Sequence, residues 1–229
     1  MAVYKTIAIG TPSQANSADG TNAISWSHTV TAGNHRVLVV GAGAVDATVG
    51  NTVVTGITYG GVAMTLVDSR TVAAGNQDVG ESLWILHNPA EGTATVAVTF
   101  TGTVLGSMGI ACQFNNVNWD TRQDVAATGT TDTGVTSIST SLTSVTAGAL
   151  GVDLVVTRLL KTHAVGSAPQ AYIGTQEQTT GGQDATLSMS SELAASAGLF
   201  SMTRSWTTGE IVAQSMMALR PAVRRVFAC

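Results

Sequence analysis

Short segments in which apolar and polar residues alternate recur along the whole chain, and this period of two constrains the fold more than any other feature. Ile24, Trp26, His28 and Val30 alternate with serine and threonine in one such segment. Successive side chains of a strand point to opposite faces of a sheet, so the pattern predicts a half-buried strand with a hydroxyl face in water. Residues 37–42 are apolar at almost every position, which predicts a central strand covered on both faces.

Glycine, asparagine and proline separate these segments. Gly60 and Gly61 stand between two strand-like runs and predict a tight hairpin, because glycine accepts the positive φ of primed turns. The pattern indicates about 13 strands of roughly five to nine residues. They cover residues 24–30, 37–42, 53–59, 62–67, 82–86, 95–100, 108–114, 136–142, 149–156, 170–176, 186–190, 200–206 and 211–219.

Such strand spacing is typical of sandwiches or barrels, and we predict an all-β protein built as a single antiparallel β-sandwich. We expect an N-terminal strand or arm at residues 1–20, the sandwich at 21–221 and a C-terminal tail at 222–229. Residues 118–134 are polar and rich in turn residues. We interpret them as a long connection within one sandwich, because neither half alone has enough strands to close a core.

Charge is scarce, at 10% of residues against about 25% in an average globular protein. With a net charge of −4, the chain has no broad basic surface for nucleic acid. Its apolar runs are all far shorter than the roughly 18 residues that span a bilayer, and residues 1–6 do not resemble a signal peptide. We therefore expect no nucleic-acid or membrane partner, synthesis in a cytoplasm and, if the protein is found outside the cell, release by a route such as lysis.

A search for catalytic or metal-binding patterns finds none. The four histidines are scattered singly, whereas a zinc or iron site needs three or four converging ligands. Most carboxylates lie in turns, and loops such as residues 19–22 match no known calcium-binding spacing. Asp153 is the exception, between Val152 and Leu154, and we expect it at an edge or solvent-facing strand position. The sequence predicts no enzyme, no catalytic residue, no cofactor and no metal.

The aromatic residues and cysteines are expected mainly in the core. Trp26, Trp84 and Trp206 lie within apolar strand patterns, and Cys112 lies within an apolar run. Trp119 lies in a polar loop and is the candidate for stacking on a glycan, with a plug over the edge of the core as the alternative.

Both ends of the chain are candidates for attachment. Residues 1–9 are strand-like, and an exposed strand can pair with another chain. Arg224, Arg225 and Phe227 give the tail a basic and aromatic character suited to an anchor, with a solvated tail as the alternative.

The order of several short motifs resembles a family of β-sandwich structural proteins of tailed bacteriophages and prophages, with related modules in secreted bacterial proteins. The motifs are residues 25–30 (SWSHTV), 34–40 (NHRVLVV), 54–65 (VTGITYGGVAMT), 83–84 (LW), 88–89 (NP), 92–96 (GTATV), 205–206 (SW) and 218–221 (ALRP). Together they extend over residues 20–221. The family has no catalytic signature to transfer to this chain.

The resemblance implies a virion component with a jelly-roll-like sandwich exposed on a particle surface. We expect a non-enzymatic capsid decoration or cement protein, which assembles as a homo-oligomer and contacts the capsid shell. The alternative is a glycan- or receptor-binding module of a tail fibre or of a secreted protein.

Overall fold

The structure is a computed structural model that describes residues 3–17, 20–118, 123–124, 127–166, 168–179 and 184–224. Within those ranges the regular elements are antiparallel strands, and no helix occurs. The prediction of an all-β antiparallel sandwich is confirmed. The described residues form sixteen strands in three larger sheets, more than the thirteen expected, and a further two-stranded pair.

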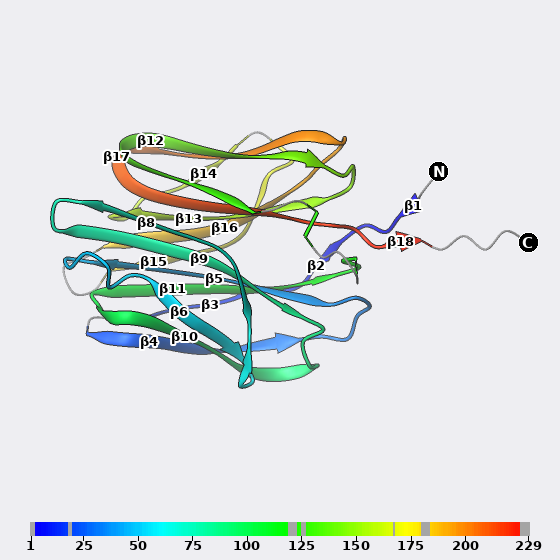
Figure 1. The fold of residues 1–229 in the computed structure, drawn as a ribbon, viewed down its shortest axis with the longest axis horizontal. Helices are drawn as coiled ribbons and strands as arrows, with labels where there is room; N and C mark the ends of the chain where they lie inside the picture. The colour runs from blue at the N-terminus through cyan, green and yellow to red at the C-terminus, as the bar shows by residue number, and fades with distance from the viewer. Residues whose placement is uncertain are drawn as a thin grey trace, which may run out of the picture.

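The three larger sheets are stacked as layers (Figure 1). The first outer sheet has the order β4-β10-β6-β7. Its strands are β4 (Thr21–Val30), β10 (Gly92–Val104), β6 (Val54–Tyr59) and β7 (Val62–Ala63). The middle sheet has the order β2-β11-β5-β9-β8, and β3 also pairs with β11. Its strands are β2 (Ala8–Ile9), β3 (Ser13–Ser17), β11 (Gly106–Asn115), β5 (Val37–Asp46), β9 (Gln77–His87) and β8 (Thr65–Ala74).

The second outer sheet has the order β12-β17-β13-β16-β15, and β14 also pairs with β17. Its strands are β12 (Thr128–Val145), β17 (Gly198–Leu219), β13 (Leu150–Arg158), β16 (Ala185–Leu193), β15 (Ala171–Gln178) and β14 (Ala164–Val165). The separate pair joins the two ends of the chain, β1 (Val3–Tyr4) and β18 (Val223–Arg224).

Residues 37–42 are apolar because they lie in β5 of the middle sheet, which is covered by an outer sheet on each face. Alternate residues of β5 face opposite sides, so Leu38 and Val40 pack against the first outer sheet while Val37 and Val39 pack against the second. Every residue of β5 is buried. The expected central strand is therefore confirmed, and the sandwich has one more layer than the usual two.

A further layer comes from the second outer sheet itself. Register shifts between Asp132 and Ser137 interrupt the pairing of β12 with β17. Beyond them the two strands lie over the outer face of their own sheet, where Phe200 and Met202 are buried with Met216. Gly151 permits this close approach, because a Cβ there would lie 2.1 Å from the Phe200 ring. We call this part, residues 137–145 and 198–206 with β14, the flap.

Two strand predictions need correction. Residues 200–206 and 211–219 belong to one strand, β17, because the strand continues through the bend into the flap. Residues 62–67 are divided between β7 and β8 in two different sheets, since the chain crosses between layers at Met64. The Gly60-Gly61 hairpin is confirmed, with φ of 57° and 80° at the two glycines.

The expected core residues are mostly buried. Trp84 and Trp206 are 8% and 6% exposed, and Trp26 is partly buried against the core of the first two sheets. Cys112 is buried in the middle sheet, and burial raises the pKa of its thiol to about 12.

Candidate functional site

One end of the stacked sheets gathers both chain ends and several connecting loops (Figure 1). We call it the loop end; it comprises residues 5–6, 31–36, 88–91, 116–118 and 220–222. A series of backbone hydrogen bonds links each of its segments to the next. The amide of Lys5 donates to Ala222 O, that of Ala222 to Asn116 O and that of Asn116 to Asn34 O, each at 2.8 Å. The loop end is therefore one connected network, and both chain ends are part of it.

Unusual backbone conformations concentrate at this network. Of the four non-glycine residues with positive φ in the described chain, His35, Asn88 and Asn116 lie here, with φ of 54°, 50° and 64°. Side chains with a Cβ rarely adopt this region, and such conformations persist only where the surroundings impose them. Here the amide of Asn88 donates to Arg36 O at 2.9 Å and that of Val117 to His35 O at 3.3 Å.

Arg36 holds two of the loops together through its side chain. Its Nη1 donates to Gly33 O at 2.8 Å and to Glu91 Oε1 at 2.6 Å, and its Nε donates to Pro89 O at 3.4 Å. The Arg36 side chain is 15% exposed, whereas that of Glu91 is 52% exposed. Because this ion pair is open to solvent on one side, its main effect is to fix geometry.

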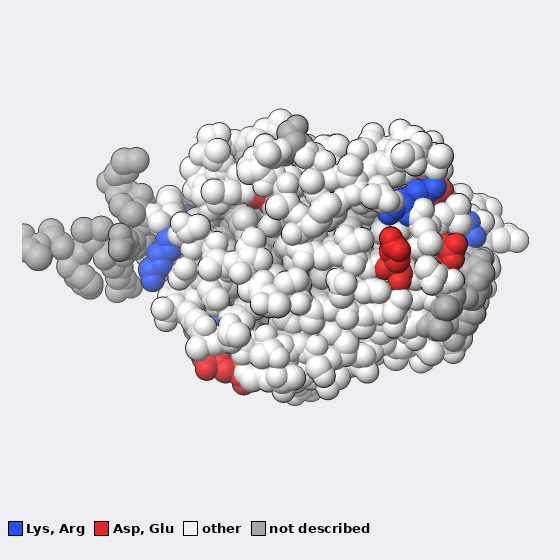
Figure 2. Space-filling model, turned by 180° about the vertical axis from the view of Figure 1, so that it is seen from behind, with Lys and Arg blue, Asp and Glu red and all other residues white. Residues whose placement is uncertain are grey.

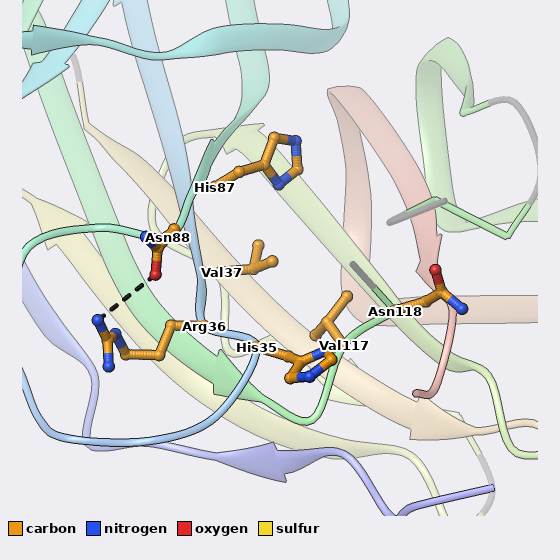
Figure 3. A pocket seen from close by; sticks show the side chains of 7 residues that line it. All are labelled: His35, Arg36, Val37, His87, Asn88, Val117 and Asn118. Atoms are coloured by element: carbon orange, nitrogen blue, oxygen red, sulfur yellow. Dashed lines mark hydrogen bonds between the residues drawn. The ribbon is translucent and has the colours of Figure 1, made fainter. Parts of the chain in front are cut away.

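Two hollows lie beside Arg36. The smaller, of about 10 Å³, has room for one water molecule. Figure 3 shows His35 next to Val117 at this hollow, with Arg36 directed towards Asn88. It is lined by His35, Arg36, Val37, His87, Asn88, Val117 and Asn118.

The larger hollow is a pocket of about 520 Å³, which lies in the size range of ligand sites. Its wall combines apolar side chains of the first outer sheet with the loop that follows β9. It is lined by Arg36, Tyr59, Gly60, Val62, Leu86, His87, Asn88, Pro89, Ala90 and Ala94. The Tyr59 hydroxyl donates to Gly92 O at 2.9 Å, which fixes the ring in the wall. The pocket suits an apolar group that carries polar or charged groups at its edge.

The residues predicted as a site are only partly placed. Trp119, Arg225 and Phe227 lie outside the described residues. Arg224 lies in β18, and its backbone pairs with Val3. From the sequence, Gly60-Gly61 and Asn88-Pro89 indicated only turns at which strands end. The sequence did not show that sheet packing brings both turns to one pocket beside Arg36.

The prediction for Asp153 is wrong, because Asp153 is fully buried in a central strand beneath the flap. Its carboxylate accepts bonds from Arg204 Nη2 at 2.8 Å, Ser190 Oγ at 2.6 Å and Gln214 Nε2 at 3.0 Å. Arg204 is also fully buried and lies 5.1 Å from the centre of the Tyr172 ring. Burial raises the pKa of Asp153, and the nearby Arg204 charge opposes that rise.

His163 belongs to the same buried region. Its Nδ1 lies 2.6 Å from Ser188 Oγ and its Nε2 lies 2.8 Å from Thr157 Oγ1. Burial, with the Arg204 charge, lowers the pKa of His163 to about 3. Its imidazole is therefore neutral at pH 7, and this region joins the flap to the sheet beneath it.

A second buried acid lies between the middle sheet and the second outer sheet. Glu81 is 1% exposed and accepts a hydrogen bond from Ser215 Oγ at 2.5 Å. Ser215 Oγ also lies 2.7 Å from Asp68 Oδ2, and Arg70 pairs with Asp68 at 2.9 Å. Burial raises the pKa of Glu81 well above its ordinary value. This group lies between strands and lines none of the pockets described above.

Among the described residues, no group of three or more histidine, cysteine, aspartate or glutamate side chains is placed to hold a metal ion. Within the same part of the chain, no helix is long and apolar enough to span a membrane. In comparisons with known proteins, no family model, no curated protein and no solved structure matches this chain.

Proposed function

We propose that the protein is a non-enzymatic structural component of a tailed-bacteriophage particle, and specifically a capsid decoration or cement protein. It is made in the host cytoplasm, assembles as a homo-oligomer and binds the capsid shell through the loop end. The observation that carries the proposal is the pairing of β1 with β18, which brings both chain ends to one end of the stacked sheets (Figure 1).

Paired chain ends suit attachment because they leave the opposite end and the sheet faces free. Loops at 31–36, 88–91 and 116–118 are hydrogen-bonded to the same end and would present a defined surface to a shell. The motif order described above, which resembles phage structural proteins, supports the same assignment.

The exposed surface also suits close packing of subunits. The outer face of the first outer sheet carries small hydroxyl side chains, with Ser27 and Thr29 of β4 beside Thr95 and Thr93 of β10. Figure 2 shows few charged side chains on the face that it draws. Surfaces with few charges can pack against neighbours without a large cost of desolvating ions.

Mass spectrometry and cryo-microscopy of particles from the phage or prophage that encodes the chain would test the proposal. We expect many copies per particle, in symmetric positions on the capsid, with the loop end towards the shell. Particles that lack the protein, or that carry it only on tail fibres, would contradict a decoration role.

A second candidate function is glycan or receptor binding by a tail-fibre or secreted module. Its supporting observation is the pocket of about 520 Å³ at the loop end, which lies in the size range of ligand sites. A glycan array would test it with the wild-type protein and the Trp119→Ala variant. Specific binding that is lost in the variant would favour this function over decoration.

A further inference from the structure

The larger pocket at the loop end presents an apolar surface without a partner in the described chain. Tyr59 in its wall is only 3% exposed, whereas Val62 is 56% exposed. Leu86, Pro89 and Ala90 add further apolar surface, and Arg36 lies at the same pocket. A pocket with this lining suits one large apolar side chain better than a highly charged ligand.

The last described strand, β18, begins at the same end of the stacked sheets as this pocket. The amide of Asn118 donates to Arg220 O at 2.7 Å, so the segment that leads into β18 is bonded to the loop end. Asn118 and Arg36 line the smaller hollow, and Arg36 also lines the larger pocket. Residues 225–229, with the sequence Arg-Val-Phe-Ala-Cys, follow β18 from this end.

The composition of residues 225–229 complements the pocket. Phe227 offers a large apolar side chain, and Arg225 precedes it by two residues. Glu91 lies next to the pocket residue Ala90, and its side chain is 52% exposed. Glu91 already accepts a hydrogen bond from Arg36 Nη1 at 2.6 Å, and its half-exposed carboxylate has room for a second arginine while the aromatic ring enters the apolar pocket.

The direction of β18 favours a pocket on another molecule. Figure 1 shows β18 leading away from the stacked sheets, and pairing with β1 holds it there. Five further residues extend at most about 17 Å. To reach the pocket of the same molecule, they would have to reverse direction directly after β18.

We propose that the pocket binds Phe227 of a second copy of this chain, with Arg225 of that copy beside Glu91. Because the pocket and β18 lie at the same end, two copies can exchange the residues that follow β18 and form a closed dimer with twofold symmetry. This inference deepens the homo-oligomer part of the proposed function. Purified protein tests it without any particle, so its outcome is independent of the copy-number experiment above.

The first test is the oligomeric state over a concentration series, measured by light scattering after size exclusion and by sedimentation velocity. A reducing agent is present throughout, so that a disulfide through Cys229 cannot produce a dimer. We expect a dimer for the wild type and a monomer for Phe227→Ala, for the deletion of residues 225–229 and for Val62→Asp. The matched control is Val49→Asp, at a site that is 58% exposed, lies after β5 and lines none of the pockets described above.

The second test uses a fluorescent peptide of residues 223–228 and the protein that lacks residues 225–229. We expect saturable binding, weakened at least tenfold by Phe227→Ala in the peptide or by Val62→Asp in the protein.

Three results would overturn the inference. The first is a wild type that stays monomeric while the peptide fails to bind. The second is a dimer that survives Phe227→Ala. The third is a monomeric wild type that excludes the peptide while the truncated protein binds it, because each tail would then occupy its own pocket.

Discussion

At the scale of single residues, the polar side chains beneath the flap depart most from what the sequence pattern indicates. Asp153 stands in an apolar strand, and Arg204, 51 positions later, supplies its counter-charge. Neither residue has a local partner that would mark it as buried. The Nε and Nη1 atoms of Arg204 have no hydrogen-bond partner among the described residues, so the position of this side chain depends on the single bond to Asp153 and on Tyr172.

Removal of one member of this buried ion pair should be costly. We expect Arg204→Met to lower the free energy of unfolding by about 3–5 kcal/mol, because Asp153 would stay buried without a counter-charge. The double variant Asp153→Asn with Arg204→Met should recover much of that loss. Urea unfolding of the wild type, Arg204→Met, Asp153→Asn and the double variant at pH 7 measures the coupling energy between the two side chains. A coupling near zero would mean that the pair does not hold the flap.

His163 should make the protein sensitive to acid. Its folded pKa is about 3, and its ordinary value is 6.5. The unfolded chain therefore binds the extra proton first as the pH falls, and stability is lost between pH 6.5 and about 3, by up to about 1.4 kcal/mol per pH unit from this group.

His163→Gln should reduce this slope, because glutamine does not titrate. The measurement is the free energy of unfolding of both proteins at pH 7, 5.5 and 4. The difference between the two proteins isolates His163 from Glu81 and Asp153, whose raised pKa values act in the opposite direction. Parallel curves for the two proteins would show that His163 takes up its proton in the folded state as well.

At the scale of elements, turns were easier to predict than the extent of strands. The Gly60-Gly61 hairpin follows directly from the residues, since both glycines need positive φ. The length of β17 does not follow, because nothing in the sequence near residues 207–210 shows that the strand bends and continues into the flap. Likewise, residues 62–67 read as one strand although Met64 marks a crossing between sheets.

The hairpin turn can be tested with a pair of glycine variants. Gly61 has a φ of 80° and free space around its Cα, so Gly61→Ala should destabilise by about 1–2 kcal/mol through backbone strain alone. Gly56 in β6 also has free space and does not have a positive φ, so Gly56→Ala is the control. We expect the control to be neutral or slightly stabilising in thermal unfolding. Equal effects of the two variants would argue against the assigned turn.

At the scale of the whole molecule, the N-terminal residues are part of the middle sheet. Residues 1–20 were expected to form a strand or arm outside the sandwich domain. In the structure, β2 and β3 pair with β11 in the middle sheet, and Ile7 is 5% exposed in the core. The N-terminal residues also contact the second outer sheet, because Asn16 Nδ2 of β3 donates to Glu177 O of its edge strand β15 at 2.6 Å.

Deletions at the two ends should therefore have unequal effects on stability. Removal of residues 1–9 eliminates β1, β2 and the buried Ile7, and Ile7→Ala alone should cost about 2–5 kcal/mol. Removal of residues 225–229 should leave the melting temperature of the monomer unchanged, because these residues follow the last described strand. Differential scanning calorimetry of dilute protein compares the two deletions. A deletion of residues 1–9 with wild-type stability would show that the N-terminal strands do not support the middle sheet.

The sequence by itself determined the class of fold, the Gly-Gly hairpin and most of the core, because period-two alternation, turn residues and apolar runs are local properties. Trp84, Trp206, Cys112 and residues 37–42 were placed correctly for that reason. Only the tertiary structure decided the number of layers, the burial of Asp153 with Arg204 and the pocket beside Arg36. Each of these depends on which strands, distant in sequence, come to lie face to face. Packing between sheets decides which strands face one another, and the alternation of apolar and polar residues along one chain does not specify those partners.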